Sequence, residues 1–217
     1  MIHVTVSNYY RRNLPHWHPS GVSIFLTWRL DGSLPLGVIE KLRVMRRELR
    51  DRTREVLQVD RLVEYKKLFA RVDAILDRAS TGPLWLSDKR IANVVQDALV
   101  NRYARLYYLW AYVVMANHIH VLLKPKNHDT SISTITKNVK GYSSREANRL
   151  LERTGQRFWQ DESFDHWSRN PSEFARIVKY IENNPVKAGL VNEPEQWEWS
   201  SAAERKRRGL TTFQSLT

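Results

Sequence analysis

Two histidines on a predicted strand are the first residues of this chain that could carry chemistry. His118 and His120 flank one isoleucine inside residues 112–123, a run rich in apolar and β-branched side chains. Such a run predicts a β-strand or strand edge. Residues two apart on a strand point to the same face of the sheet, so both imidazoles can meet one divalent cation.

A tyrosine and an asparagine on a predicted helix form the second candidate group. Residues 174–184 have a helical pattern, and Tyr180 and Asn184 lie four residues apart within it. Side chains four apart share one helix face. The two groups together offer two imidazoles and an amide oxygen to a metal, with a phenol beside them as nucleophile. This combination indicates phosphodiester chemistry.

Each of these residues also has a simpler interpretation. A second histidine pair, His16 and His18, lies between two prolines in an irregular segment, where polar packing or substrate contact is the favoured interpretation. Tyr180 alone is typical of a core or surface tyrosine, and Asn184 before a proline could cap the helix. The combination of both groups in one strongly basic chain, without another nucleophile motif, favours the chemical interpretation.

Composition and charge narrow the class of protein. The 217 residues carry 35 Lys and Arg against 23 Asp and Glu, a formal net charge of +12, which favours a polyanionic partner such as nucleic acid. The chain contains no cysteine, which excludes disulfides and thiolate zinc sites and fits the reducing cytoplasm. The longest apolar run, residues 106–116, is too short to span a membrane. We therefore expect a soluble, cytoplasmic protein without a membrane partner.

The periodicity of apolar residues predicts the elements that position these groups. We expect strands at residues 21–30, 103–115, 118–124 and 158–167, and helical segments at residues 36–77, 91–101, 130–154 and 171–183. This order predicts an α+β fold, an antiparallel sheet with helices packed on one face. We expect one domain over residues 1–203, a helical insertion over about 37–100 that serves as scaffold, and a mobile basic polar tail over 204–217.

Several segments resemble the REP-associated tyrosine transposases, which belong to the HUH single-stranded DNA endonucleases. The matching segments are MANHIHVLL at 115–123, KGYSSR at 140–145, FWQ at 158–160 with FD at 164–165, YIENNPVKAGLV at 180–191, and the lead-in at 11–19. The resemblance extends over roughly residues 9–201, and its last motif is highly specific, whereas residues 37–100 are the least diagnostic.

The resemblance implies a ferredoxin-like sheet with His118 and His120 on a central strand. It implies Tyr180 as the nucleophile, Asn184 as the third metal ligand, and Mg²⁺ or Mn²⁺ as the cofactor. The implied reaction is cleavage and transfer of single-stranded DNA at or near repeat hairpins through a 5′-phosphotyrosine intermediate, by a monomer or homodimer. The chain departs from the family at Ala116, where proline is usual, and at Asn184, where related insertion-sequence transposases carry glutamine.

Basic residues on the lead-in, on two predicted helices and shortly after the second of them are the candidate nucleic-acid contacts. They are Arg11, Arg12, Lys137, Lys140, Arg145, Arg149, Lys179 and Lys187. Two other functions remain open at this stage. One is a non-catalytic protein that binds nucleic-acid hairpins on the same fold. The other is a metal-dependent hydrolase that activates water, with Tyr180 in a structural role.

Overall fold

The computed structural model describes residues 8–11, 15–18, 21–51, 58–161, 163–212 and 214–217. The strands are β1 (Asn8–Arg11), β2 (Pro15–His18), β3 (Ile24–Arg29), β4 (Tyr107–Val114), β5 (His118–Pro125) and β6 (Phe164–Trp167). The α-helices are α1 (Leu36–Asp51), α2 (Gln58–Arg78), α3 (Lys89–Asp97), α4 (Ile132–Leu150), α5 (Pro171–Glu182), α6 (Asn184–Lys187) and α7 (Ser201–Arg208). Within these ranges, no helix is both long and apolar enough to cross a membrane.

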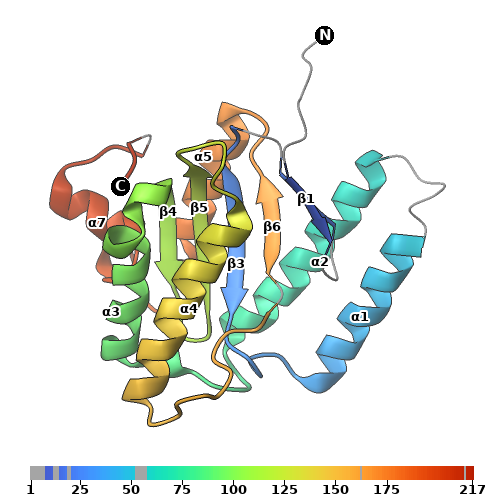
Figure 1. Cartoon of the computed structure of the whole chain (residues 1–217), viewed down its shortest axis with the longest axis horizontal. Helices are drawn as coiled ribbons and strands as arrows, with labels where there is room; N and C mark the ends of the chain where they lie inside the picture. The colour runs from blue at the N-terminus through green and yellow to red at the C-terminus, as the bar shows by residue number, and fades with distance from the viewer. Residues whose placement is uncertain (1–7, 12–14, 19–20, 52–57, 162, 213) are drawn as a thin grey trace.

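Four strands form one antiparallel sheet in the order β4-β5-β3-β6, and β1 and β2 form a separate antiparallel pair (Figure 1). The chain order of β3, α3, β4, β5, α4 and β6 is that of a ferredoxin-like fold, which confirms the predicted α+β class. In the central pair, Arg29 lies opposite His118 and Thr27 lies opposite His120. Directly opposed residues of an antiparallel pair point to one face, so these four side chains share a face of the sheet.

Helices cover both faces of this sheet, whereas the sequence predicted helices on one face. The crossover helices α3 and α4 cover the face to which Leu26 and Trp28 point, and they lie in front of the sheet in Figure 1. Helix α5 covers the opposite face through Val178 and Ile181, which pack with Phe25. The reason is that neighbouring residues of β3 are buried on both sides, and a sheet with two apolar faces needs a cover on each.

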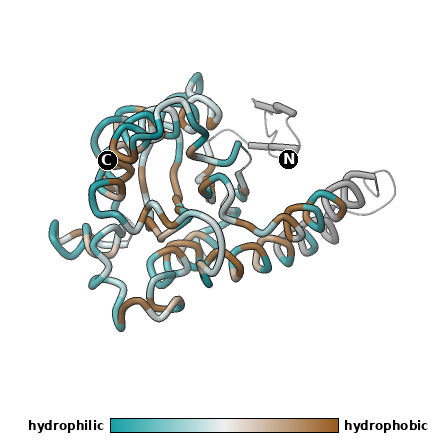
Figure 2. Tube along the Cα trace, turned by 90° about the horizontal axis from the view of Figure 1, so that it is seen from below, coloured by the Kyte–Doolittle hydropathy of each residue, from teal (hydrophilic) through white to brown (hydrophobic). Residues whose placement is uncertain are grey.

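The predicted helical insertion contains α1 and α2, which run side by side and extend beyond the sheet (Figure 2), and then the crossover helix α3. Leu42 of α1 and Leu68, Val72 and Leu76 of α2 form a small apolar cluster with Phe164 of the edge strand β6. The last turns of α2 therefore lie against the sheet. The packing follows from the three- and four-residue spacing of the apolar residues along α2.

The C-terminal residues pack against the fold, in contrast to the mobile tail that the sequence predicted from residue 204. Arg205 of α7 is buried, with its Nε 3.2 Å from Glu182 Oε1. Further along the chain, the backbone N–H of Leu216 donates to the carbonyl of Leu109 over 2.8 Å, and the Leu216 side chain joins the larger core. Burial of one leucine and one ion-paired arginine holds this segment in place.

Candidate active site

A tight turn between β4 and β5 fixes the positions of the two histidines. The N–H of Met115 donates to the carbonyl of His118 over 2.9 Å and closes this turn. His118 and His120 are fully buried and share one face of β5, with 4.8 Å between their ring centroids. The sequence-based prediction that both imidazoles face one point is consistent with this geometry.

The hydrogen bond between Asn117 and His118 determines which ring nitrogen of His118 carries the proton. The Asn117 amide nitrogen donates to the carbonyl of Leu76 over 3.1 Å, which turns its Oδ1 toward His118 Nδ1 at 2.7 Å. Because this oxygen can only accept, Nδ1 carries the proton and Nε2 keeps its lone pair. In metal-binding histidines, a hydrogen bond from the ring nitrogen that does not bind the metal usually fixes the tautomer in this way. His120 Nδ1 lies 2.7 Å from the hydroxyl of Thr27, which can either accept from it or donate to it.

Helix α5 brings Tyr180 beside the histidines. The helix begins at the cap Asn170, whose side chain accepts from the N–H of Glu173, and its apolar face packs on the sheet. The rings of Tyr180 and His120 have centroids 5.6 Å apart. Asn184 follows at the start of α6 and is fully buried, and neither atom of its side-chain amide has a hydrogen-bond partner in the described structure.

Helix α2 supplies two carboxylates that the sequence interpretation missed. Asp73 and Asp77 lie one helical turn apart, and Asp73 is only 1% exposed. Asp73 Oδ1 lies 3.0 Å from His120 Nε2, and Asp77 Oδ1 lies 3.7 Å from His118 Nε2. The Tyr180 hydroxyl donates to Asp73 Oδ2. The insertion therefore contributes directly to the site and is more than a scaffold.

A sequence signal for Asp73 does exist. It lies four residues after Phe69 and three before Leu76, on the same helical face as these two buried or partly buried residues. An ionisable residue on an apolar helix face is costly unless it is paired or binds a cation. The position of Asp73 could therefore have marked it as a functional candidate, whereas its partners could not be deduced.

The charged groups of the site lie close enough to shift one another's pKa. Lys187 Nζ of α6 lies 2.7 Å from Asp77 Oδ2 and 3.4 Å from Asp73 Oδ2. Burial alone would raise the pKa of Asp73, but the imidazoles of His120 and His118 and the Tyr180 hydroxyl hold that pKa well below its ordinary value. Burial, followed by the charge of His120, lowers the pKa of His118 to about 3. At neutral pH, Asp73 is thus ionised and His118 is neutral.

The same environment keeps Tyr180 protonated at rest. Burial raises the pKa of Tyr180, and the neighbouring Asp73 carboxylate raises it further. Burial and then the charge of Asp73 raise the pKa of Asp77 as well. A cation near Asp73 would offset the negative charge that opposes ionisation of the phenol.

The donor atoms in this site fit a divalent cation. Nε2 of His118 and Oδ1 of Asn184 are buried and lack a hydrogen-bond partner in the described structure, whereas Asp73 Oδ1 and His120 Nε2 face each other at 3.0 Å. Such orphaned polar atoms are uncommon and costly unless an ion or water satisfies them. The ligand atoms of Asp73, His118 and His120 lie within 4.8 Å of one another. A set of imidazoles with carboxylate or amide oxygens suits Mn²⁺, and the oxygens suit Mg²⁺.

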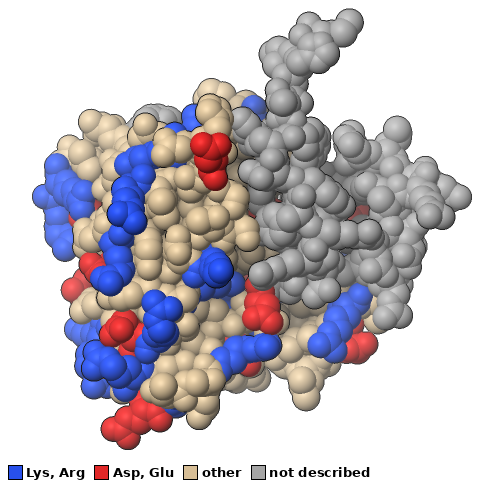
Figure 3. All heavy atoms as spheres, viewed as in Figure 1, with Lys and Arg blue, Asp and Glu red and all other residues tan. Residues whose placement is uncertain are grey.

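The predicted nucleic-acid contacts fall into two groups. Lys179 and Lys187 lie on α5 and α6, on the face of the sheet that carries Tyr180, and Lys187 is in the ion pairs described above. The members on α4, across the sheet, are Lys137, Lys140, Arg145 and Arg149. Figure 3 shows Lys and Arg side chains spread over the face of the molecule on which α4 lies. The side chains of Arg11, His16 and His18, and the whole of Arg12, lie outside the described residues.

Comparison with known proteins finds transposases. Residues 87–184 match the model of a family described as "Transposase IS200 like". The REP-associated tyrosine transposase of Escherichia coli (strain K12) is 27% identical over 100 residues, which cover 46% of this chain and 57% of that protein. This similarity confirms the resemblance seen in the sequence, and it spans only about half of each chain. The matched family residues include both histidines, Tyr180 and Asn184, and exclude α2.

A solved structure supports the fold over a longer stretch. The structure described as a REP-associated tyrosine transposase bound to a REP hairpin superimposes with a TM-score of 0.53 and 17% sequence identity. The superposition covers 94% of this chain and 88% of that one. This chain therefore shares the fold of that structure, and here the fold is a four-stranded antiparallel sheet with helices on both faces.

Proposed function

We propose that this protein is a metal-dependent single-stranded DNA endonuclease and strand transferase that acts at or near DNA hairpins through a 5′-phosphotyrosine intermediate. The observation that carries the proposal is the convergence of three elements on one buried point. Strand β5 brings two imidazoles, and α5 brings the phenol of Tyr180 into ring contact with His120. Helix α2 brings the Asp73 carboxylate, which accepts a hydrogen bond from that phenol and lies beside His120.

The cation would be held by His118 and His120 together with Asp73, Asn184 or both. When bound, Mg²⁺ or Mn²⁺ supplies stabilisation of the negative charge that develops on the phosphoryl oxygens. Asp73 is the new member of this set relative to the sequence-based prediction. Its support is the buried carboxylate oxygen, Oδ1, which lies 3.0 Å from His120 Nε2 and within 4.8 Å of the ligand atoms of both histidines.

The chain's own residues then carry the bond changes. The Tyr180 oxygen attacks the phosphorus of the scissile phosphate, forms a tyrosyl–phosphate bond and loses its phenolic proton. The bond between phosphorus and the 3′ oxygen breaks, and this oxygen leaves as a hydroxyl after gaining a proton. Asp73 orients the phenol, because it accepts the hydrogen bond of that hydroxyl. Attack by a 3′-hydroxyl on the same linkage reverses the step and rejoins strands without ATP.

The proposed substrate is single-stranded DNA with a repeat hairpin, encountered in the cytoplasm. The superimposed relative is described as bound to a REP hairpin, and the net charge of +12 favours a polyanion. Exposed basic residues on α4 and α5 would contact phosphates and supply affinity, while contacts to bases would supply sequence preference. Lys137, Arg145, Arg149 and Lys179 are the exposed members of this set.

The deciding experiment compares Tyr180→Phe with the native protein on a labelled oligonucleotide that carries an imperfect hairpin and a single-stranded flank. With Mn²⁺ present, we expect the native protein to form a covalent protein–DNA band on a denaturing gel. Tyr180→Phe should reduce this product by about 10⁴-fold or more, because the nucleophile is removed. DNA binding should change by less than about twofold, since one phenol oxygen adds little to a phosphate-driven affinity.

The exposed Tyr108 of β4 provides a matched control, and Tyr108→Phe should cleave as the native protein does. If Tyr180→Phe still nicks DNA when metal is present, the reaction uses activated water and Tyr180 is structural.

The burial of the site favours one second candidate, a hairpin-binding protein that does not cut. His118, His120 and Asn184 have no solvent-exposed surface, and α2 lies over them through Asp73. This candidate predicts tight hairpin binding without metal dependence and without a covalent adduct for any of several hairpins and metals.

A further inference from the structure

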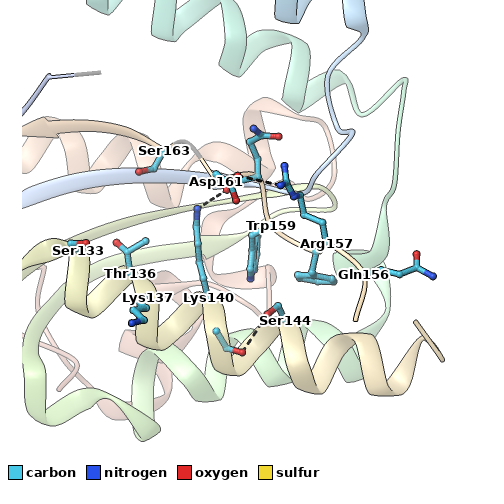
Figure 4. Close-up of a pocket in the computed structure, with 13 residues that line it drawn as sticks. Ser133, Thr136, Lys137, Lys140, Ser144, Gln156, Arg157, Trp159, Asp161 and Ser163 are labelled. Atoms are coloured by element: carbon cyan, nitrogen blue, oxygen red, sulfur yellow. Dashed lines mark hydrogen bonds and ion pairs between the residues drawn. The ribbon is translucent and has the colours of Figure 1, made fainter. Parts of the chain in front are cut away.

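A pocket on the opposite side of the sheet from the histidines lies between α4 and residues 156–161 with Ser163 (Figure 4). Its volume is about 340 Å³, at the lower end of the range of about 300 to 1,000 Å³ usual for small-molecule and cofactor sites. Lys140 points from α4 into this region, and its Nζ donates to the carbonyl of Gln160 over 2.8 Å. The pocket is thus bordered by two segments that are tied together.

The lining combines positive charge, neutral hydrogen-bonding groups and an apolar wall. Lys137, Lys140 and Arg157 carry the positive charge. Hydroxyls and amides that can meet the edges of a base are those of Ser133, Thr136, Ser144, Gln156, Gln160 and Ser163. The wall contains Phe158 and Trp159, both largely buried, and the Trp159 indole donates to the hydroxyl of Ser143 over 2.9 Å. This bond holds the wall in one orientation.

Negative charge around the pocket is partly offset. Among the described residues that line it, Asp161 is the only carboxylate, and its Oδ2 lies 3.4 Å from Arg157 Nη2. Two lysines beside a small polar chamber favour a phosphate-bearing ligand. The chamber is too small for the groove-wide contact of a duplex, and it suits one unstacked nucleotide.

The position of the pocket connects it to the proposed cleavage site. Trp159 forms an isolated antiparallel bridge with Leu30, and the N–H of Gln160 donates to the carbonyl of Arg29 over 2.9 Å. Arg29 is the residue directly opposite His118 in the sheet. The pocket wall therefore continues the sheet at the end that carries His118. Because the pocket opens on the α4 face and the histidines on the α5 face, a nucleotide in it is not the one that is cut.

We propose that this pocket binds one unpaired nucleotide of the single-stranded DNA, with its phosphate against Lys137 and Lys140 and its base against the polar groups of the chamber. The proposal rests on the proposed function, because it assigns a second subsite to the same DNA strand. The pocket would fix which phosphate reaches Tyr180 by holding the strand at a set distance from it.

Gly141 allows the pocket to be filled without altering a charge. It lines the pocket within α4, and a Cβ atom added there would meet only the flexible end of Arg145, at an ordinary contact distance of 3.7 Å. Gly141→Phe should place a ring over the chamber, and Gly141→Ala should add only a methyl group. Circular dichroism and thermal unfolding would establish that both variants are folded.

The experiment measures affinity for a single-stranded, hairpin-flanking oligonucleotide without divalent metal, and for a series in which one nucleotide at a time is made abasic. For the native protein, we expect one position at which loss of the base weakens binding about tenfold, the effect of losing one or two hydrogen bonds in a pocket. Gly141→Phe should weaken binding of the intact strand by a similar factor and remove the effect of that position. Gly141→Ala should show a smaller change.

A second test removes one lysine charge, so that the pocket can be examined without relying on the fold of Gly141→Phe. Lys137→Gln should weaken binding of the intact strand more than Lys206→Gln, which removes the same charge from the exposed face of α7. Equal losses in these two variants, or no position with an abasic effect in the native protein, would overturn the pocket assignment. That result can occur while the Tyr180 adduct still forms. Conversely, a pocket effect without any adduct would overturn only the catalytic proposal.

Discussion

Helices α5 and α2 both bring an oxygen atom to the two histidines, but they are held in place differently. Helix α5 lies across the sheet, with Val178 and Ile181 buried against Phe25 and Leu122. Helix α2 meets the sheet through its last turns, where Val72 and Leu76 pack near Phe164 at the edge strand. In the site, α2 adds one aromatic contact, with the Phe69 ring beside those of Phe25 and Tyr180, and the two carboxylates of Asp73 and Asp77.

This difference separates a half of the site that lies on the sheet from a half that depends on the docking of α2 at its edge. The phenol of Tyr180 is positioned by apolar packing along a whole helix. The carboxylates lie on a helix whose apolar packing is mainly at the edge strand, so hydrogen bonds and ion pairs contribute a larger share of their positioning. The backbone of α2 also orients His118, because the Leu76 carbonyl accepts from the Asn117 amide. Displacement of α2 would therefore change both the charge and the histidine geometry of the site.

The largest expected effect comes from the half that lies on the sheet, where β5 carries the histidines. His118→Ala removes one of the two imidazoles, so metal-dependent cleavage of the hairpin oligonucleotide should fall to background, and excess Mn²⁺ should not restore it fully. The matched control is His128→Ala, at an exposed turn after the end of β5. Cleavage by His118→Ala at the native rate would show that the β5 histidines do not hold the cation.

The next effect tests whether α2 belongs to the metal site. Asp73→Asn keeps the shape and an oxygen that can accept from Tyr180, but it removes the charge. We expect the affinity for Mn²⁺, measured by titration calorimetry, to fall about 10- to 100-fold. Asp77→Asn is the control one helical turn away, and its loss should be smaller because Asp77 lies farther from its histidine, 3.7 Å against 3.0 Å for Asp73. Unchanged Mn²⁺ affinity in Asp73→Asn would leave Asn184 as the oxygen ligand.

The smallest effect concerns the docking of α2. Lys187→Met removes the cation that pairs with both carboxylates. Because the lysine side chain is 52% exposed, the free energy of unfolding should fall by only about 1 kcal/mol in urea denaturation. Amide hydrogen exchange in the last turns of α2 should become faster, while exchange in α5 stays as it is. Lys179→Met, an exposed substitution on α5, is the control, and equal exchange changes in both variants would contradict a specific role of Lys187 in docking.

Local patterns in the sequence determined much of the fold and half of the site. The strand period placed His118 and His120 on one face, and the helix period placed Tyr180 and Asn184 one turn apart. The caps that begin α4 and α5 are also local, since Ser131 and Asn170 each accept a backbone N–H three residues later. These features could be predicted because they depend on residues fewer than five positions apart.

Tertiary structure alone decided which residues complete the site. The helical spacing shows that Asp73 lies on the apolar face of α2, but its contact with His120 joins residues 47 positions apart along the chain, and its bond to Tyr180 spans 107 positions. The same holds for Leu216, whose backbone N–H donates to the Leu109 carbonyl and whose side chain is buried in the core, although the sequence predicted a mobile tail there. Periodicity fixes the side of a helix that is buried, and it carries no information on which partner buries it. That choice depends on the docking of elements distant in the chain, where packing and paired charges act together.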